Sequence, residues 1–374
     1  MYQKNIWKDA DATKTEKITA FCEDYKKFLS YAKTERLAVE ETERIAREHG
    51  FKKFDEVKEI KAGEKIYFIN KNKNVILYRM GKKPLSEGMR ILGAHIDSPR
   101  LDLKQNPLYE SEGFALFDTH YYGGIKKYQY VTTPLAIHGV VCKKDGTIVK
   151  VNVGECDDDP ILGISDLLIH LSQKQLTATA DKVVEGENLD VTVGSIPLNG
   201  EDDESVKKNI LKIFKDKYGV EEDDFASAEL EIVPAGKARD YGLDRSMIAA
   251  YGHDDRVCAY TSLIALLDSD TEDYTACCVL VDKEEIGSVG ATGAASVFFE
   301  NTVAELLVKS GDTNYLSRIK ALENSYALSS DVNAALDPLF KEVASKNNVA
   351  RFNYGIVFEK YTGARGKSGA SDAN

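Results

Sequence analysis

The sequence predicts an α/β fold with a mixed or parallel sheet, interrupted by an inserted domain that is mainly β. Apolar strand-like runs alternate with helix-like segments before residue 100 and again after residue 237, an order typical of α/β proteins. Between residues 101 and 236 the apolar runs are short, alternating and separated by turn residues, as in antiparallel sheets. We therefore expect a discontinuous α/β domain of residues 1–100 and 237–374, with a β-rich domain of residues 101–236 inserted into it.

The first hundred residues predict two helices, a hairpin and a strand. Apolar residues recur at helical spacing over residues 14–32, and a second helix is expected from Thr34, a typical N-cap residue, to His49. Two β-rich runs at residues 65–69 and 75–78 flank a polar segment and predict a hairpin. The apolar run that begins at residue 89 ends in His95-Ile96-Asp97 and is stopped by Pro99.

The rest of the chain contributes the second set of elements. In the inserted part we expect a helix at 203–217, a hairpin turn at Asp145-Gly146, and strands at 113–117, 128–131, 135–141, 147–153 and 228–233. After it we expect a helix from His253 to Leu267, a buried strand at 274–282, a largely helical segment at 288–308, and strands at 327–332 and 355–358.

Composition excludes several classes of function. The net charge is −12, and the short lysine clusters at 71–73 and 207–208 are interpreted as solvated turns and helix faces, so we expect no nucleic-acid partner. No apolar run approaches the roughly 20 residues that a membrane span needs, and the first residues lack the apolar core of a signal peptide. The six cysteines form no CxxC pair or regular framework. We therefore expect a cytoplasmic protein without a membrane partner.

Four strand ends or strand–helix junctions each carry a group that can bind a metal ion: His95, Asp254, Glu285 and Asp331. An imidazole with several carboxylates suits Zn²⁺, and also Mn²⁺ or Co²⁺. Two neighbouring cations need a bridging carboxylate, and Asp254, at a helix start, is the natural bridge. The alternative for each acid alone is a charged turn that caps a strand, but together, at the strand ends of one predicted sheet, they favour a metal site.

Two further acids complete this hypothesis. Glu284, beside a predicted ligand, is placed to act as general base towards a metal-activated water. Asp97, two residues after His95, is placed to hold the second nitrogen of that imidazole and so to fix its tautomer.

Four segments in order resemble the signature segments of the aspartyl aminopeptidase family of metallo-aminopeptidases, which includes yeast vacuolar aminopeptidase I. They are Gly93 to Asp102, His253 to Tyr260, Asp282 to Ser288 and Ser329 to Ala335. The resemblance runs from the N-terminal helices to the last residue. It implies a zinc-exopeptidase-like catalytic domain with a mixed sheet, interrupted by a mainly β dimerisation domain, and a two-zinc enzyme that removes N-terminal residues from peptides. It also implies a dimer-based homo-oligomer, a tetrahedral dodecamer in the family.

The resemblance also implies roles for single residues. His95 and Asp331 would hold one zinc ion and Glu285 the other, with Asp254 bridging, Glu284 as general base and Asp97 behind His95. His170 matches a histidine that is presented to a neighbouring subunit's active site; its alternative is an ordinary histidine on a helix face. Lys360 lies where the family has a lysine that contacts substrate. Preferences for acidic and for neutral N-terminal residues both occur in the family.

The sequence departs from the family pattern at its C-terminus. The family has one more metal ligand, a histidine several dozen residues beyond the point where this chain stops, and residues 369–374 resemble the middle of a motif. We expect either a truncated fragment or a chain without that fifth ligand, which makes a catalytically impaired fragment or a non-catalytic assembly subunit the alternative function. A related di-zinc amidohydrolase acting on non-peptide amides is a second alternative.

Two other motifs are given little weight. His253 neighbours the bridging Asp254, which makes it a poor substitute ligand, and we interpret it as a packing residue. The segment Gly363 to Ser368 resembles a phosphate-binding loop, but Tyr361 stands where that loop requires its first glycine.

Overall fold

The computed structural model describes residues 4–270, 273–345, 347–361 and 370. The chain forms two compact units. One unit comprises residues 25–330, and the other comprises residues 1–24 together with 331–374. In the second unit, the backbone N–H of Ile6 donates to the carbonyl of Asn353 at 2.8 Å, and Ala335 pairs with Ala350 in a single parallel bridge.

The helices and strands have these bounds. The α-helices are α1 (Ala12–Tyr31), α2 (Glu35–Glu48), α3 (Ser205–Tyr218), α4 (His253–Asp268), α5 (Phe298–Lys309) and α6 (Tyr315–Glu323). The strands are β1 (Lys52–Lys53), β2 (Lys65–Asn70), β3 (Asn74–Arg79), β4 (Met89–His95), β5 (Arg100–Ser111), β6 (Phe114–Tyr122), β7 (Leu135–Cys142), β8 (Ile148–Val153), β9 (Val191–Gly194), β10 (Ala228–Pro234), β11 (Arg239–Tyr241), β12 (Met247–Ala249), β13 (Thr275–Val281) and β14 (Tyr326–Ser329).

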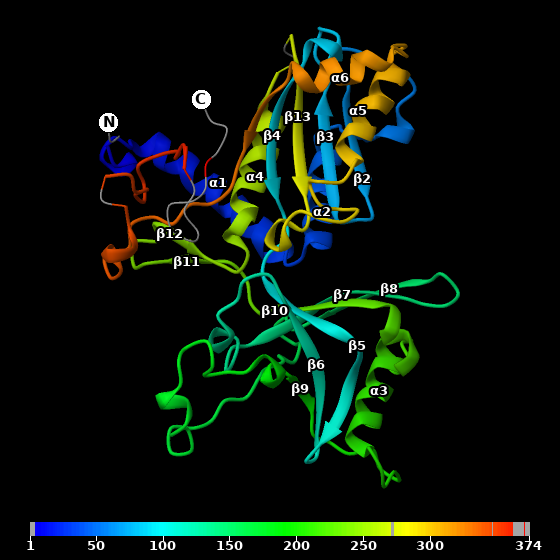
Figure 1. The fold of residues 1–374 in the computed structure, drawn as a ribbon, viewed down its shortest axis with the longest axis vertical. Helices are drawn as coiled ribbons and strands as arrows, with labels where there is room; N and C mark the ends of the chain where they lie inside the picture. Colours follow the sequence, from blue (N-terminus) through cyan, green and yellow to red (C-terminus); the bar gives the residue numbers. More distant parts are fainter. Residues whose placement is uncertain (1–3, 271–272, 346, 362–369, 371–374) are drawn as a thin grey trace. The chain divides into compact units, whose positions relative to one another are not determined.

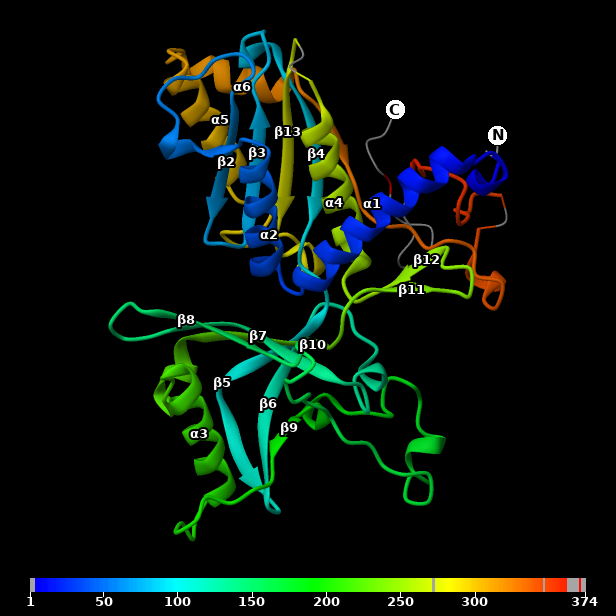
Figure 2. The same ribbon diagram turned by 180° about the vertical axis from the view of Figure 1, so that it is seen from behind.

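The first sheet is mixed and has the strand order β1-β2-β3-β13-β4-β14. The β2–β3 hairpin is antiparallel and β3 is antiparallel to β13, whereas β13, β4 and β14 run parallel to one another. Helices α2 and α4 lie on one face of this sheet, and α5 and α6 lie on the other (Figures 1 and 2). This arrangement confirms the predicted α/β class with a mixed sheet.

Alternation along the central strands explains why both faces are covered. In β13, Cys278 packs into the cluster that includes residues of α2 and α4, and its neighbour Cys277 packs into the cluster that includes residues of α5 and α6. In β3, Leu77 and Tyr78 divide between the two faces in the same way. Successive side chains of a strand point to opposite faces, so a continuous apolar run such as β13 needs a helical layer on each side.

The second sheet is antiparallel and has the order β8-β7-β10-β5-β6-β9. It is built from residues 100–234, and helix α3 packs its buried face, Val206, Ile210 and Phe214, into the core of this sheet. The chain enters the sheet through β5 and leaves it through β10, and these two strands are neighbours, with Asp102 opposite Glu231. The entry and the exit of this sheet therefore lie side by side.

The N-terminal predictions are confirmed within one or two residues. The side chain of Thr34 accepts a hydrogen bond from the N–H of Leu37, and the C-cap of α2 is His49, followed by Gly50 with φ +83°. The hairpin β2–β3, the strand β4 and the helix α4 also lie where the sequence predicts them. The turn at Asp145-Gly146 joins the antiparallel strands β7 and β8.

Three predicted elements are wrong. Residues 128–131 form the end of a short 3₁₀ helix and a turn, because Tyr130 and Val131 are buried as single side chains in the core of the second sheet rather than paired in a strand. The predicted helix at 288–308 begins only at Phe298, because Gly287 and Gly290 have positive φ and start a loop. The predicted strand at 355–358 is an exposed segment without strand pairing in the part of the chain that the structure describes.

One interpretation of charge is also wrong. Lys73 is not a solvated turn residue: it is 8% exposed, and its ammonium group lies 3.0 Å from the buried carboxylate of Glu35 and also contacts Glu229.

Within the described residues, no helix combines the length and apolarity that a membrane span would need.

Candidate metal centre and active site

The site is built where parallel strands end. Strands β13, β4 and β14 are parallel neighbours, with Val281 opposite His95 and Ser329 opposite Gly93. Their carboxyl ends therefore meet at one edge of the sheet, which is where ligand sites collect in α/β proteins. His95 is the last residue of β4, and Glu284 and Glu285 follow β13 in a short 3₁₀ helix, Glu284–Ile286.

Three predicted ligands come together within the unit of residues 25–330. One ligand atom each of His95, Asp254 and Glu285 lies within 4.8 Å of the other two. Nε2 of His95 is 3.1 Å from Oδ1 of Asp254. An imidazole and two carboxylates at this spacing form a donor set that suits zinc, so the side chains present fit the metal ion that the sequence predicts.

Electrostatics make this cluster receptive to a cation. Burial and the carboxylate of Asp254 raise the pKa of Glu285 to about 7, and Asp97 and Glu284 add to this effect, while His95 opposes it. Carboxylates gathered without a counter-ion repel one another and resist ionisation. A divalent cation would remove that repulsion by holding the carboxylates in their charged form.

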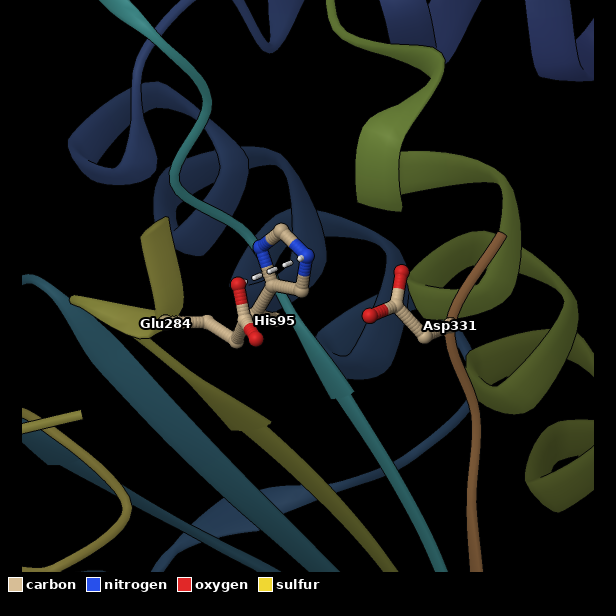
Figure 3. Close-up of side chains that lie close together, drawn as sticks. All are labelled: His95, Glu284 and Asp331. Atoms are coloured by element: carbon tan, nitrogen blue, oxygen red, sulfur yellow. Dashed lines mark ion pairs between the residues drawn. The ribbon is translucent and has the colours of Figure 1, made fainter. Parts of the chain in front are cut away.

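Glu284 lies beside the cluster. Its carboxylate faces the imidazole of His95, with Oε2 3.8 Å from Nε2 (Figure 3). The side chain of Glu284 is 46% exposed, whereas that of His95 is only 3% exposed. An acid that reaches the histidine and is also open to solvent can exchange protons with a water molecule at this edge of the sheet.

Asp97 joins several groups of the site by hydrogen bonds. Its Oδ1 lies 3.2 Å from Nδ1 of His95 and accepts from the backbone N–H of Glu284. Its Oδ2 accepts from the N–H of Glu285 and, at 2.7 Å, from the hydroxyl of Tyr122. Burial alone would raise the pKa of Asp97, but the hydrogen bonds from His95 and Tyr122 hold it below its usual value. The charged carboxylate therefore orients the imidazole and both glutamates.

Three predicted site residues remain: Asp331, His170 and Lys360. Asp331 directly follows Ser330, whose N–H donates to the carbonyl of Gly93, and it is the first residue after the unit of residues 25–330. His170 is exposed in a turn, not on the helix face that was its alternative. Lys360 is exposed in the unit that contains the C-terminal segment.

Both nitrogens of His253 are engaged away from a ligand role. Nδ1 lies 3.0 Å from the hydroxyl of Tyr25, and Nε2 lies 3.1 Å from the carbonyl of Ile248. This agrees with its interpretation as a packing residue. The glycine-rich segment 363–368, and the terminal segment 369–374 apart from Ala370, lie outside the described residues.

Sequence reasoning missed the residues of the second sheet that contact this site. Tyr122, the last residue of β6, and Gly123 approach Asp97 and Glu285 from the inserted part of the chain. Arg100, the first residue of β5, lies under the ring of Tyr122. The strand β5 itself was not predicted, so the sequence offered no signal that brought these residues to the metal cluster.

Comparison with known proteins identifies a family. A model of the family described as aminopeptidase I zinc metalloprotease (M18) matches residues 28–374. A probable M18 family aminopeptidase 1 of Clostridium acetobutylicum is 55% identical over 99% of this chain and 81% of its own length. A protein of the same description from Thermotoga maritima is 44% identical over 100% of this chain and 82% of its own length.

Solved structures agree with this similarity. The crystal structure of an M18 family aminopeptidase from T. maritima matches with a TM-score of 0.95 and 43% identity, over 100% of this chain and 82% of that one. The crystal structure of aminopeptidase I from C. acetobutylicum matches with a TM-score of 0.89 and 53% identity, over 99% and 81% of the two chains.

Proposed function

Because the chain belongs to the M18 family of aminopeptidase I zinc metalloproteases, we propose that it removes N-terminal residues from peptides by hydrolysis at a centre of two zinc ions. The chain is a metallo-aminopeptidase by its family. The single observation that carries the finer proposal is the cluster of His95, Asp254 and Glu285, whose ligand atoms lie within 4.8 Å of one another.

The ligands divide between the two ions as follows. When the ions are bound, His95 and Asp331 would hold one of them, Glu285 would hold the other, and Asp254 would be the ligand shared by both. Nε2 of His95 lies 3.1 Å from Oδ1 of Asp254. This short distance supports the proposal that both side chains bind the same ion. Asp331 follows β14, whose carboxyl end lies beside that of β4. Mn²⁺ or Co²⁺ suits the same oxygen-rich set.

The residues of the chain supply the acid–base chemistry. Zinc, when bound, polarises the scissile carbonyl and makes a water molecule easier to deprotonate. Glu284 would take the proton of that water as the water oxygen bonds to the carbonyl carbon, and would return the proton to the leaving amine as the C–N bond breaks. Asp97 holds Nδ1 of His95, so Nε2, which lies 3.1 Å from Oδ1 of Asp254, is the nitrogen that would bind the cation.

Self-association belongs to the same proposal. We assign residues 1–100 and 237–374 to the catalytic domain and 101–236 to a dimerisation domain. Leu168, Ile169 and Leu171, which flank His170, are each more than half exposed, and apolar side chains left in solvent favour contact with another subunit. His170 then reaches a neighbouring active site, and Lys360 contacts the substrate.

A dodecamer is described for the yeast protein mApe1, which is 22% identical over 88% of this chain and 75% of its own, with a TM-score of 0.71. A cytoplasmic location stays a prediction from the sequence.

Replacement of Glu284 tests the mechanism. Glu284→Gln keeps the size of the side chain but removes its basicity, so we expect kcat for an aminoacyl-anilide to fall by roughly 10²–10⁴-fold. Bound zinc, measured by elemental analysis, should stay at the wild-type level. The matched control is Glu300→Gln, an exposed glutamate in α5, which should leave both quantities unchanged.

Three outcomes would contradict the proposal. Retained turnover in Glu284→Gln would remove Glu284 from the role of base. A wild-type chain that binds no zinc and hydrolyses no anilide would favour the non-catalytic assembly subunit, and turnover of non-peptide amides alone would favour an amidohydrolase.

A further inference from the structure

A residue of the second sheet donates a hydrogen bond to Asp97, which lies behind the predicted metal ligand His95. Tyr122 ends β6, and its hydroxyl donates to Oδ2 of Asp97 at 2.7 Å. The tyrosine is 8% exposed and Asp97 is fully buried. A charge-assisted hydrogen bond of this length in a buried setting is among the stronger ones that a neutral donor makes.

The carboxylate of Asp97 also contacts three other groups of the site. Its two oxygens serve Nδ1 of His95 and the backbone N–H groups of Glu284 and Glu285, at 3.2 Å each. The bond from Tyr122 is the shortest of the four. The tyrosine hydroxyl therefore fixes the plane of the carboxylate, and the carboxylate orients the backbone of both glutamates. It also orients the imidazole, together with the carbonyl oxygen of Asp97, which lies 3.1 Å from Nδ1 of His95.

The ring of Tyr122 is itself fixed. The guanidinium of Arg100 lies 3.9 Å from the ring centroid, a distance at which a cation is attracted to the aromatic face. Arg100 is held in turn by the carboxylates of Glu35 and Glu231, at 3.3 Å and 3.1 Å. The tyrosine hydroxyl thus approaches Asp97 from a direction that buried ion pairs determine.

The residue after Tyr122 also fits closely. Gly123 has φ +73°, and a Cβ atom built on it would lie 3.3 Å from Cβ of Glu285. That contact is closer than side chains usually make, so the end of β6 is packed directly against a predicted metal ligand. Two successive residues of the second sheet therefore touch the site, one by a hydrogen bond and one by close packing.

We infer that Tyr122 is a positioning residue of the metal centre, through which the inserted sheet orients Asp97 and, with it, His95 and Glu285. The inference rests on the proposed function, in which those two residues bind zinc. A partner behind a metal ligand typically contributes about 10–100-fold to metal affinity or activity. Loss of the Tyr122 hydroxyl should therefore weaken zinc binding even though it touches no ligand itself.

The test compares two Tyr→Phe variants of the full chain. Tyr122→Phe removes the bond to Asp97, and the matched control Tyr130→Phe removes a hydroxyl that donates to the carbonyl of Pro99 at 3.2 Å. Both tyrosines are 8% exposed. We expect the zinc dissociation constant, measured by chelator competition, to rise about 10-fold or more in Tyr122→Phe and to change less than threefold (about 0.65 kcal/mol, since 1.4 kcal/mol is tenfold) in the control.

A double variant separates positioning from general damage. If Tyr122 acts through Asp97, then Tyr122→Phe adds little to the loss of zinc affinity in Asp97→Asn, because the pair is already broken. Equal zinc affinities in Tyr122→Phe, Tyr130→Phe and wild type would overturn this inference and leave the proposed function standing. Full additivity in the double variant would also overturn it. A wild-type chain without zinc would overturn both.

Discussion

Replacing Arg100 with methionine should destabilise the protein more than any surface substitution in the same strand. Arg100 is 4% exposed, and its guanidinium contacts Asp102 at 2.8 Å, Glu231 at 3.1 Å and Glu35 at 3.3 Å. Glu35 and Glu231 are 0% and 1% exposed. Methionine keeps the unbranched stem but removes the charge, so two buried carboxylates lose their shared cation.

The magnitude follows from the burial. Removing one partner of a buried ion pair costs about 3–5 kcal/mol, because the remaining charge is left without compensation. Two features favour the lower end of that range. Lys73 stays 3.0 Å from Glu35, and Glu231, whose pKa burial already raises well above its usual value, can take up a proton. At roughly 2 °C per kcal/mol for a unit of this size, Tm should fall by about 6–10 °C.

The assay is thermal unfolding followed by circular dichroism. The control is Lys104→Met in the same strand, which removes an exposed ion pair to Asp118 of 2.7 Å; such pairs contribute about 0–1 kcal/mol, so its Tm should change by no more than about 2 °C. The double variant Arg100→Met/Glu231→Gln should recover part of the loss, because the buried carboxylate is neutralised together with its partner. If Arg100→Met unfolds within about 2 °C of Lys104→Met, the reasoning is refuted.

Two further predictions concern pH and assembly. Burial would raise the pKa of Glu155, but His138 and Lys33 hold it below the usual 4.5; a lowered pKa adds stability above about pH 4.5 that is lost as pH falls through the folded-state value. Glu155→Gln should therefore lower Tm at pH 7, and Tm of this variant should fall less than that of wild type between pH 5 and pH 3. A plot of Tm against pH that runs parallel to that of wild type would contradict this. His170→Ala should lose turnover without losing zinc. Mixing it with Glu284→Gln subunits should restore some activity, because one site then combines Glu284 of one subunit with His170 of the other. No recovery in mixed oligomers would exclude a role of His170 in a neighbouring site.

The predictions that the structure confirms are those that depend on residues close together in the sequence. Thr34 caps α2 and Gly50 follows its end because capping and positive φ are properties of single residues in short contexts. The strand ending at His95 was visible because its central residues, Ile91 to Ala94, form an apolar run. The failures, at residues 128–131 and 288–297, are places where burial against distant residues or glycine-initiated loops overrode a local pattern.

In the candidate site, too, some features followed from the sequence and others only from the structure. Residue types at strand ends were sufficient to select His95, Asp254 and Glu285, and the parallel order of β13 and β4 explains why two of these ends meet. Nothing in the sequence linked Tyr122 to Asp97, because 25 residues and a change of sheet separate them. That contact exists only because β5 and β6 carry the chain away from the first sheet and back to its edge.

By itself, the sequence determined many of the helices and strands, and it selected the acids and the histidine that we propose hold a cation. These depend on side-chain type and on spacing of a few residues, which a chain carries wherever it folds. Only the tertiary structure decided how those groups are held. The buried charges of Arg100, Glu35 and Glu231 and the hydroxyl of Tyr122 come from four separate elements. Their partners are chosen by packing, because a buried polar group must find its partner wherever the fold places one.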